Sequence, residues 1–131
     1  MVISDEEIAS PILDQAQTVL LLDSSQTGDF ENRVRPGGMM IVESSGLEYE
    51  PERKDFRLLP VSGLEKAMEM GSSVVNNLIM LGVYTELVKP FSPDLIDEEL
   101  ERRYGNKESV LDLNKKAFHH GLEMAKQIES V

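Results

Sequence analysis

Residues 73–88 restrict the possible folds of this chain more than any other segment. Their sequence, SVVNNLIMLGVYTELV, predicts a helix whose apolar side chains point in almost every direction. A helix without a polar face is normally buried on several sides. We therefore predict that this helix forms the centre of the fold and that other segments pack around it. Two adjacent asparagines, Asn76 and Asn77, interrupt its apolar surface.

The flanking residues predict helices on both sides of this central one. Ser62 and Glu65 have the Ser-x-x-Glu spacing of a capping box, and Gly71 is a natural C-terminal stop. Ser92, followed by a proline and an acid, is a strong start for another helix. A stripe of apolar and small residues at helical spacing predicts one more. The expected helical segments are 62–70, 73–88, 92–104 and 107–128.

Three continuous apolar runs in the first half of the chain predict strands. Runs of this length are typical of strands buried on both faces, as in a parallel sheet covered by helices. A short apolar start to the chain is interpreted as the end of a further strand. The runs are residues 18–23, 39–43 and 55–60, and the short start is residues 2–4.

The polar segments between these runs predict the connections. Residues 24–35 are interpreted as a short helix or helical turn, Pro36-Gly37-Gly38 as a turn, and residues 44–54 as a charged loop. Ser4 is placed to cap a helical turn over residues 5–7. Strands alternating with helical segments indicate an α/β fold, with a mostly parallel sheet flanked by helices and a helical C-terminal half. A chain of 131 residues has the size of one domain, so residues 1–131 are predicted to form a single domain.

Composition excludes several kinds of site. The chain has no cysteine, so it carries no disulfide, thiolate metal site, cysteine nucleophile or cysteine-ligated iron–sulfur cluster. The chain has 24 acidic and 13 basic residues, and its net charge of −11 disfavours binding to nucleic acid. The acidity favours either a basic partner or simple solubility, and solubility is the preferred interpretation. The start lacks a signal peptide, and the apolar runs are shorter than the ~20 residues that span a bilayer. We expect a cytoplasmic protein that does not bind a membrane.

The few candidates for chemistry also have structural interpretations. Asn76, Asn77 and Asn114 lie on apolar helical surfaces, where each could face a ligand or another subunit. We favour a structural role, in which an asparagine ties a neighbouring loop to its helix. His119 and His120 point about 100° apart on a helix, so they cannot share one metal ion without partners elsewhere. Either could act as a general base, but one half-buried and one exposed histidine is the preferred interpretation.

Of two further patterns, one indicates close packing between helices and the other is rejected as a cofactor motif. A small-residue row, Ala117, Gly121 and Ala125, would let another helix approach closely at Gly82. Gly28-Asp29 is followed by Phe30, whereas the magnesium motif of thiamine diphosphate enzymes needs glycine there. We therefore predict neither a catalytic nor a metal site on this chain.

The ordered set of motifs resembles a known family. From residue 60 onward the chain is similar to the C-terminal portion of the gamma subunit of 2-oxoacid:ferredoxin (acceptor) oxidoreductases. That family has a strand ending in proline, a helix, a glycine, a Val-x-Asn-x-x-x-Leu-Gly core helix and a Leu-Asn-x-x-Ala-Phe-x-x-Gly pattern. The matching residues are Pro60, Gly71, Val75, Asn77, Leu81, Gly82, Leu113, Asn114, Ala117, Phe118 and Gly121.

The resemblance covers nearly the whole chain, with one departure. The start, VISDEEIASP, resembles the Ser-Asp-x-x-Ile-x-x-Pro segment of the family, and Pro36-Gly37-Gly38 resembles its next turn. Family members normally begin with a Gly-x-Gly-Gly-Gln-Gly element, which this sequence does not contain. We therefore expect a gamma-subunit domain that lacks its N-terminal glycine-rich portion, and cofactor-binding residues cannot be assigned here.

The resemblance implies a subunit, or a fragment of one, that carries no cofactor itself. Its partners would be alpha-, beta- and delta-type subunits, which carry thiamine diphosphate, magnesium and iron–sulfur clusters, with ferredoxin and coenzyme A acting at the level of the complex. The complex would decarboxylate a 2-oxoacid oxidatively to an acyl-CoA, and the isolated chain would be inactive. Pyruvate, 2-oxoglutarate, branched-chain 2-oxoacids such as ketoisovalerate, and indolepyruvate all stay open as substrates. The alternative is a stand-alone α/β binding or interaction domain without catalytic activity.

Overall fold

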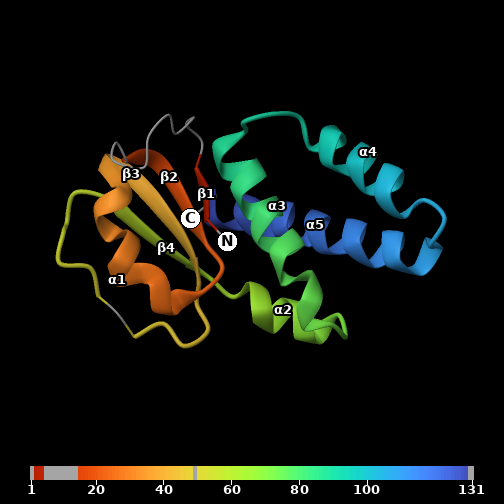
Figure 1. Ribbon diagram of the computed structural model, residues 1–131, viewed down its shortest axis with the longest axis horizontal. Coiled ribbons are helices and arrows are strands. Elements are labelled where there is room, and N and C mark those ends of the chain that lie inside the picture. The colour runs from red at the N-terminus through yellow and green to blue at the C-terminus, as the bar shows by residue number, and fades with distance from the viewer. Residues whose placement is uncertain (1, 5–14, 49, 130–131) are drawn as a thin grey trace. The chain divides into compact units, whose positions relative to one another are not determined.

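The computed structural model describes residues 2–4, 15–48 and 50–129 (Figure 1). The chain divides into two compact units, residues 1–62 and residues 63–131. The first unit holds a sheet and the second is helical, which confirms the predicted α/β class with a helical C-terminal half. That residues 1–131 act as a single domain stays a prediction.

The first unit contains a four-stranded sheet with the order β1-β2-β3-β4. β2 pairs with β3 and β3 with β4 in parallel, and β1 is antiparallel to β2. The mostly parallel sheet is therefore confirmed. The predicted helical turn over residues 5–7 lies outside the described residues. The strands are β1 (Val2–Ser4), β2 (Ala16–Leu21), β3 (Val34–Glu43) and β4 (Arg57–Val61).

The sheet is held by the apolar runs that the sequence indicated. In the middle of the sheet Leu20 aligns with Ile41, and Ile41 with Leu59. Neighbouring residues of one strand point to opposite faces, yet Leu20 and Leu21 are both fully buried. Both faces of β2 are therefore covered, as expected for a parallel strand.

β3 is longer than predicted because the Pro36-Gly37-Gly38 segment lies inside the strand and does not form a turn before it. β2 advances two residues from Ala16 to Thr18 while β3 advances five, from Val34 to Met39, so the register shifts here. Gly37 accommodates the irregularity at φ +82°. A side chain at Gly38 would meet the Gln17 carbonyl oxygen. Residues that are typical of a turn therefore form a bulge within a strand.

The connections in this unit agree with the prediction. Between β2 and β3 the chain forms short helical segments, and between β3 and β4 it runs as a loop. The helical segments are η1 (Ser24–Gln26), α1 (Thr27–Phe30) and η2 (Glu31–Arg33).

The second unit contains the four predicted helical segments. Gly71, at φ +96°, ends α2 in a Schellman motif: the Ser72 N–H donates to the Ala67 carbonyl at 3.1 Å, and the Gly71 N–H to that of Met68 at 3.0 Å. The Ser92 side chain caps α4 by accepting from the Asp94 N–H at 3.3 Å. The elements are α2 (Gly63–Glu69), η3 (Ser73–Val75), α3 (Asn76–Val88), α4 (Pro93–Tyr104) and α5 (Glu108–Glu129).

α3 and α5 cross at a pair of glycines. A Cβ built on Gly82 would lie 2.9 Å from the Cα of Gly121, and one on Gly121 would overlap the carbonyl oxygen of Ile79. Ala117 and Ala125 flank the crossing and are fully buried. The close helix approach expected from the small-residue row is therefore confirmed.

Candidate functional site

The carboxyl ends of β2, β3 and β4 form the candidate site in the first unit. Because these strands are parallel, their carboxyl ends lie at the same edge of the sheet, which is where open α/β sheets bind ligands. Each strand is followed within three residues by serine. We call these residues the serine edge: Ser24, Ser25, Ser44, Ser45 and Ser62.

Hydrogen bonds join the three loops of the serine edge. The Ser24 hydroxyl donates to the Ser45 carbonyl at 2.6 Å, which links the loops after β2 and β3. The hydroxyls of Ser44 and Ser62 lie 3.2 Å apart, which links the loops after β3 and β4. Ser24 is buried, while Ser25, Ser45 and Ser62 are exposed. Hydrogen bonds between its own loops therefore stabilise the edge, and its exposed serines face solvent.

Two carboxylates position the backbone of this edge. Asp23 accepts from the Ser25 hydroxyl at 2.7 Å and from the Ser25 N–H at 2.9 Å, and these bonds lower the pKa of Asp23. Glu43 is only 3 % exposed, and its carboxylate accepts from the Ser45 N–H at 2.6 Å. Both histidines of the chain lie outside residues 1–62, so this unit has no serine–histidine pair for nucleophilic catalysis. The arrangement is suited to hydrogen bonding with an oxygen-rich ligand.

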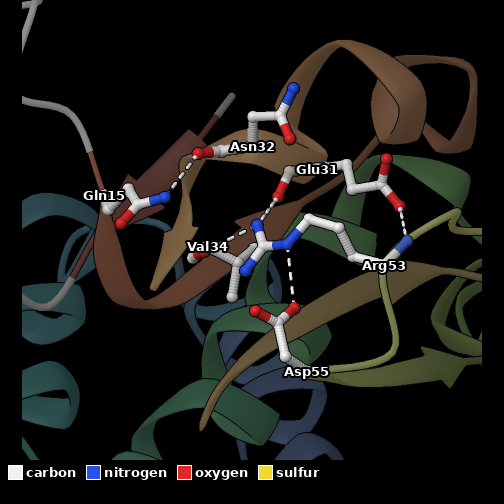
Figure 2. A network of polar contacts seen from close by, with 6 residues as sticks. All are labelled: Gln15, Glu31, Asn32, Val34, Arg53 and Asp55. Carbon is white, nitrogen blue, oxygen red and sulfur yellow. Dashed lines mark hydrogen bonds and ion pairs between the residues drawn. The ribbon is translucent and has the colours of Figure 1, made fainter. Parts of the chain in front are cut away.

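The opposite, amino edge of the sheet is organised by Arg53 (Figure 2). Its Nη1 donates to the carbonyls of Glu31 at 2.7 Å and Val34 at 2.9 Å, and its Nε donates to Asp55 at 2.8 Å. The bond from Arg53 lowers the pKa of Asp55. The guanidinium also lies 5.1 Å from the centre of the Phe56 ring. These contacts tie the loop before β4 to the start of β3, so Arg53 has a structural role.

His119 connects two helices of the second unit. Its Nε2 lies 2.9 and 3.0 Å from the two carboxylate oxygens of Asp97, which joins α5 to α4. His119 is exposed and His120 is half-buried, as expected from the sequence. In the described part of the chain, no group of three or more His, Cys, Asp or Glu side chains is placed to hold a metal ion. Its helices also include none with the length and apolarity needed to cross a membrane.

Comparison with known proteins identifies the family. The family model described as "Pyruvate ferredoxin/flavodoxin oxidoreductase" matches residues 1–124. This chain belongs to that family. The resemblance to the 2-oxoacid:ferredoxin oxidoreductase family, deduced from the ordered motifs, is therefore confirmed.

Curated relatives of this oxidoreductase family are much longer than the chain. It is 24 % identical to ketoisovalerate oxidoreductase subunit VorA of Methanothermobacter marburgensis over 97 % of its own length. It is 26 % identical to the VorA subunit of Methanothermobacter thermautotrophicus over the same share. The chain spans about a quarter of these relatives, 27 % and 26 % of their lengths.

Two solved structures of oxidoreductases share the fold. The gamma subunit of a keto/oxoacid ferredoxin oxidoreductase from Geobacter sulfurreducens superposes with a TM-score of 0.76 at 23 % identity, over 86 % of this chain and 66 % of that one. A 2-oxoglutarate:ferredoxin oxidoreductase from Magnetococcus marinus, solved with 2-oxoglutarate, coenzyme A and succinyl-CoA bound, superposes with a TM-score of 0.75 at 26 % identity. The second match covers 87 % of this chain and 20 % of that one.

The two family-motif asparagines bond within their own helices. The Asn77 oxygen accepts from the Leu78 N–H at 3.0 Å, and Asn77 is exposed on α3. The Asn114 amide donates to the Val110 carbonyl at 2.8 Å inside α5. A tie from either of them to a neighbouring loop is not seen among the described residues. Whether Asn77 and Asn114 contact a ligand or another subunit, or serve the fold alone as we favour, stays a prediction.

The remaining family-motif residues occupy backbone or packing positions. Pro60 lies in β4 opposite Val42, and Gly71 ends α2. Gly82 and Gly121 meet at the helix crossing. Leu81 and Asn77 share a cleft of about 200 Å³ between α3 and α4. The structure therefore brings together two pairs of these residues and distributes the others over both units.

Sequence reasoning missed the serine edge. A signal was present, because each of the three predicted strands of the parallel sheet is followed closely by serine: LLLDSS, IVESS and LLPVS. Serine after a strand is ordinary turn chemistry by itself. It becomes a candidate site only once the parallel order of β2, β3 and β4 places the three loops at one edge.

Proposed function

We propose that this chain is a gamma-type subunit of a 2-oxoacid:ferredoxin oxidoreductase and supports the oxidative decarboxylation of a 2-oxoacid to an acyl-CoA. The observation that carries the proposal is the family match over residues 1–124, together with the fold shared with two such oxidoreductases. The partners would be alpha-, beta- and delta-type subunits, with ferredoxin as the electron acceptor, in a cytoplasmic complex.

The chain's own residues do not fit the redox cofactors of such a complex. An iron–sulfur cluster needs thiolate ligands, and the sequence has no cysteine. Thiamine diphosphate would need a Gly-Asp-Gly magnesium motif, which is broken at Phe30. Thiamine diphosphate, magnesium and the iron–sulfur clusters are therefore assigned to the partner subunits in this proposal.

Within the complex, the serine edge is proposed to lie on the acyl-acceptor side of the active site. Its exposed hydroxyls, at Ser25, Ser45 and Ser62, can donate to or accept from the oxygen-rich parts of coenzyme A. Asp23 and Glu43 hold the backbone to which these hydroxyls are attached. The contribution of this chain is thus binding and orientation of the acceptor.

Residues 1–131 are proposed to form one gamma-type domain without the glycine-rich N-terminal element of the family. The DNA immediately upstream of Met1 tests this part. A separate gene that ends before Met1 and encodes the missing element would support a split subunit. A continuous reading frame that carries the element would show that residues 1–131 are a fragment of a longer gamma-type subunit.

Co-purification tests the proposed function. The whole chain, tagged and expressed in its native source, should bring down an assembly that reduces ferredoxin when given coenzyme A and one of four acids: pyruvate, 2-oxoglutarate, ketoisovalerate or indolepyruvate. The purified chain alone should be inactive. Turnover by the isolated chain, or a tagged chain that elutes alone and inactive, would refute the proposal. Anion binding by such a lone chain would favour a stand-alone binding domain.

A further inference from the structure

The charged side chains of the sheet unit are divided between its two edges. Residues 1–62 contain five basic residues, and all of them belong to the amino edge. Two flank Val34, the first residue of β3, a third donates to the Val34 carbonyl, and the other two line one hollow with Gly37 in the bulge of β3. The five are Arg33, Arg35, Arg53, Lys54 and Arg57. The carboxyl edge therefore receives no positive charge from its own unit.

The carboxyl edge carries acidic groups instead. Asp23 lies two residues after β2 and is exposed, and the bonds from Ser25 that lower its pKa favour the ionised carboxylate. Glu43, the last residue of β3, uses its carboxylate to accept from the Ser45 N–H. A phosphate group placed here would meet negative charge, and this unit has no cation at the edge to offset the repulsion. The serine edge is therefore suited to a ligand part that is polar but carries no negative charge.

Ser45 has the hydroxyl best prepared for such a ligand. Its backbone is held on both sides, because its N–H donates to Glu43 at 2.6 Å and its carbonyl accepts from the Ser24 hydroxyl at 2.6 Å. Ser45 is exposed, and its hydroxyl makes no hydrogen bond to another described residue. A hydroxyl can donate one bond and accept others, so this one can pair with an amide or a hydroxyl of a ligand. The fold thus fixes the position of Ser45 and leaves its hydroxyl available.

Coenzyme A has a matching division of charge. Its nucleotide part carries the diphosphate and the 3′-phosphate, whereas its pantetheine arm is neutral and carries amide and hydroxyl groups. Resting on the proposed function, we infer that the serine edge binds the pantetheine arm and that basic groups outside the sheet unit bind the phosphates. The exposed Asp23 carboxylate agrees with this assignment, because it can accept from an amide N–H or a hydroxyl of the arm but repels a phosphate.

Inhibition by the two parts of coenzyme A tests the assignment in the co-purified complex. N-ethylpantothenamide has the pantetheine arm without its thiol, and adenosine 3′,5′-bisphosphate has phosphates of the nucleotide part without the arm. Ser45→Ala should raise the inhibition constant of N-ethylpantothenamide about fivefold and leave that of the bisphosphate unchanged. The control Ser109→Ala, at an exposed serine of α5, should change neither constant.

The outcomes of this experiment separate the inference from the proposed function. An unchanged constant for N-ethylpantothenamide, or a raised one for the bisphosphate, would overturn the assignment of the pantetheine arm to the serine edge. A wild-type preparation that lacks oxidoreductase activity would count against the proposed function instead.

Protection from alkylation tests the same assignment without an activity assay. Since the chain has no cysteine, Ser45→Cys introduces a unique thiol, and Ser109→Cys provides the control. In the co-purified complex, saturating N-ethylpantothenamide should slow the alkylation of Ser45→Cys by iodoacetamide at least about threefold, because a bound ligand buries the groups that it contacts. The bisphosphate should not slow it, and neither compound should protect Ser109→Cys. Mass spectrometry of the single cysteine-containing peptide measures the rates. Equal protection by both compounds, protection by the bisphosphate alone, or no protection would overturn the inference.

Discussion

The two edges of the parallel sheet use polar side chains in opposite ways. At the amino edge, one guanidinium donates to two carbonyls and one carboxylate, and its bonds run inward between segments of the same unit. At the carboxyl edge, five serines share a few bonds, and three of these residues are exposed. The amino edge therefore stabilises the unit through internal bonds, whereas the carboxyl edge has exposed hydroxyl groups that can contact a ligand.

The physical basis is donor geometry. Arginine has five N–H donors in a planar fork, so one arginine can donate to several groups that lie far apart in sequence. Arg53 does this for residues 19 and 22 positions earlier in the chain. A serine hydroxyl has one donor, so a serine that braces one neighbour still has acceptor capacity for another group. Stability should therefore depend on the amino edge, and ligand binding on the carboxyl edge.

Arg53→Ala should produce the largest loss of stability. It removes three side-chain hydrogen bonds, one of them to the charged Asp55, from a partly buried site. We expect the free energy of unfolding to fall by about 2–3 kcal/mol. Urea unfolding followed by circular dichroism measures it. The control Arg57→Ala, at an exposed position on the same edge, should change stability by less than about 0.5 kcal/mol. Equal effects of the two substitutions would remove the distinction between a bracing arginine and a surface one.

Ser24→Ala should cost about 1 kcal/mol, because it deletes the one buried hydroxyl of the serine edge and its bond to the Ser45 carbonyl. The same unfolding measurement applies. Ser45→Ala should leave stability within about 0.5 kcal/mol of wild type, since Ser45 is exposed. A loss for Ser45→Ala as large as that for Ser24→Ala would mean that the exposed hydroxyls also support the fold.

The difference between the edges also explains what could be predicted from the sequence. Strands and helices depend on local signals, such as the apolar run in β2, Gly71 after α2 and Ser92 before α4, and these were predicted. The start of β3 was missed because Pro36-Gly37-Gly38 has the local chemistry of a turn, and only pairing with β2 shows that it is a bulged strand. The Arg53 contacts and the serine edge join residues about 20 positions apart, so no local pattern indicates them.

Substitution in the serine edge should change acceptor binding in the assembled enzyme. If the edge contacts coenzyme A as proposed, Ser45→Ala should raise the KM for coenzyme A about fivefold, the effect of losing roughly 1 kcal/mol of hydrogen bonding, with kcat unchanged. Ser109→Ala, an exposed serine on α5, is the matched control and should leave KM unchanged. Initial rates of the co-purified complex at varied coenzyme A provide both constants. A change in kcat alone, or no change at all, would place the acceptor elsewhere.

The smallest expected effect is a difference in acid sensitivity between the edges. The bond from Arg53 lowers the pKa of Asp55 below its usual 3.8, so this pair stabilises the folded state above that pH, and its contribution is lost as pH falls through the lowered value. Asp55→Asn should therefore flatten the decline in stability below about pH 4 and lower stability slightly at neutral pH. Urea midpoints measured from pH 7 to pH 3 detect both changes. The pKa of Asp23 is also lowered, by its bonds to Ser25, and Asp23 is exposed beside the serine edge. If Asp23→Asn flattened the acid decline more than Asp55→Asn, the carboxyl edge would be the more tightly braced of the two, and the assignment of roles to the edges would have to be reversed.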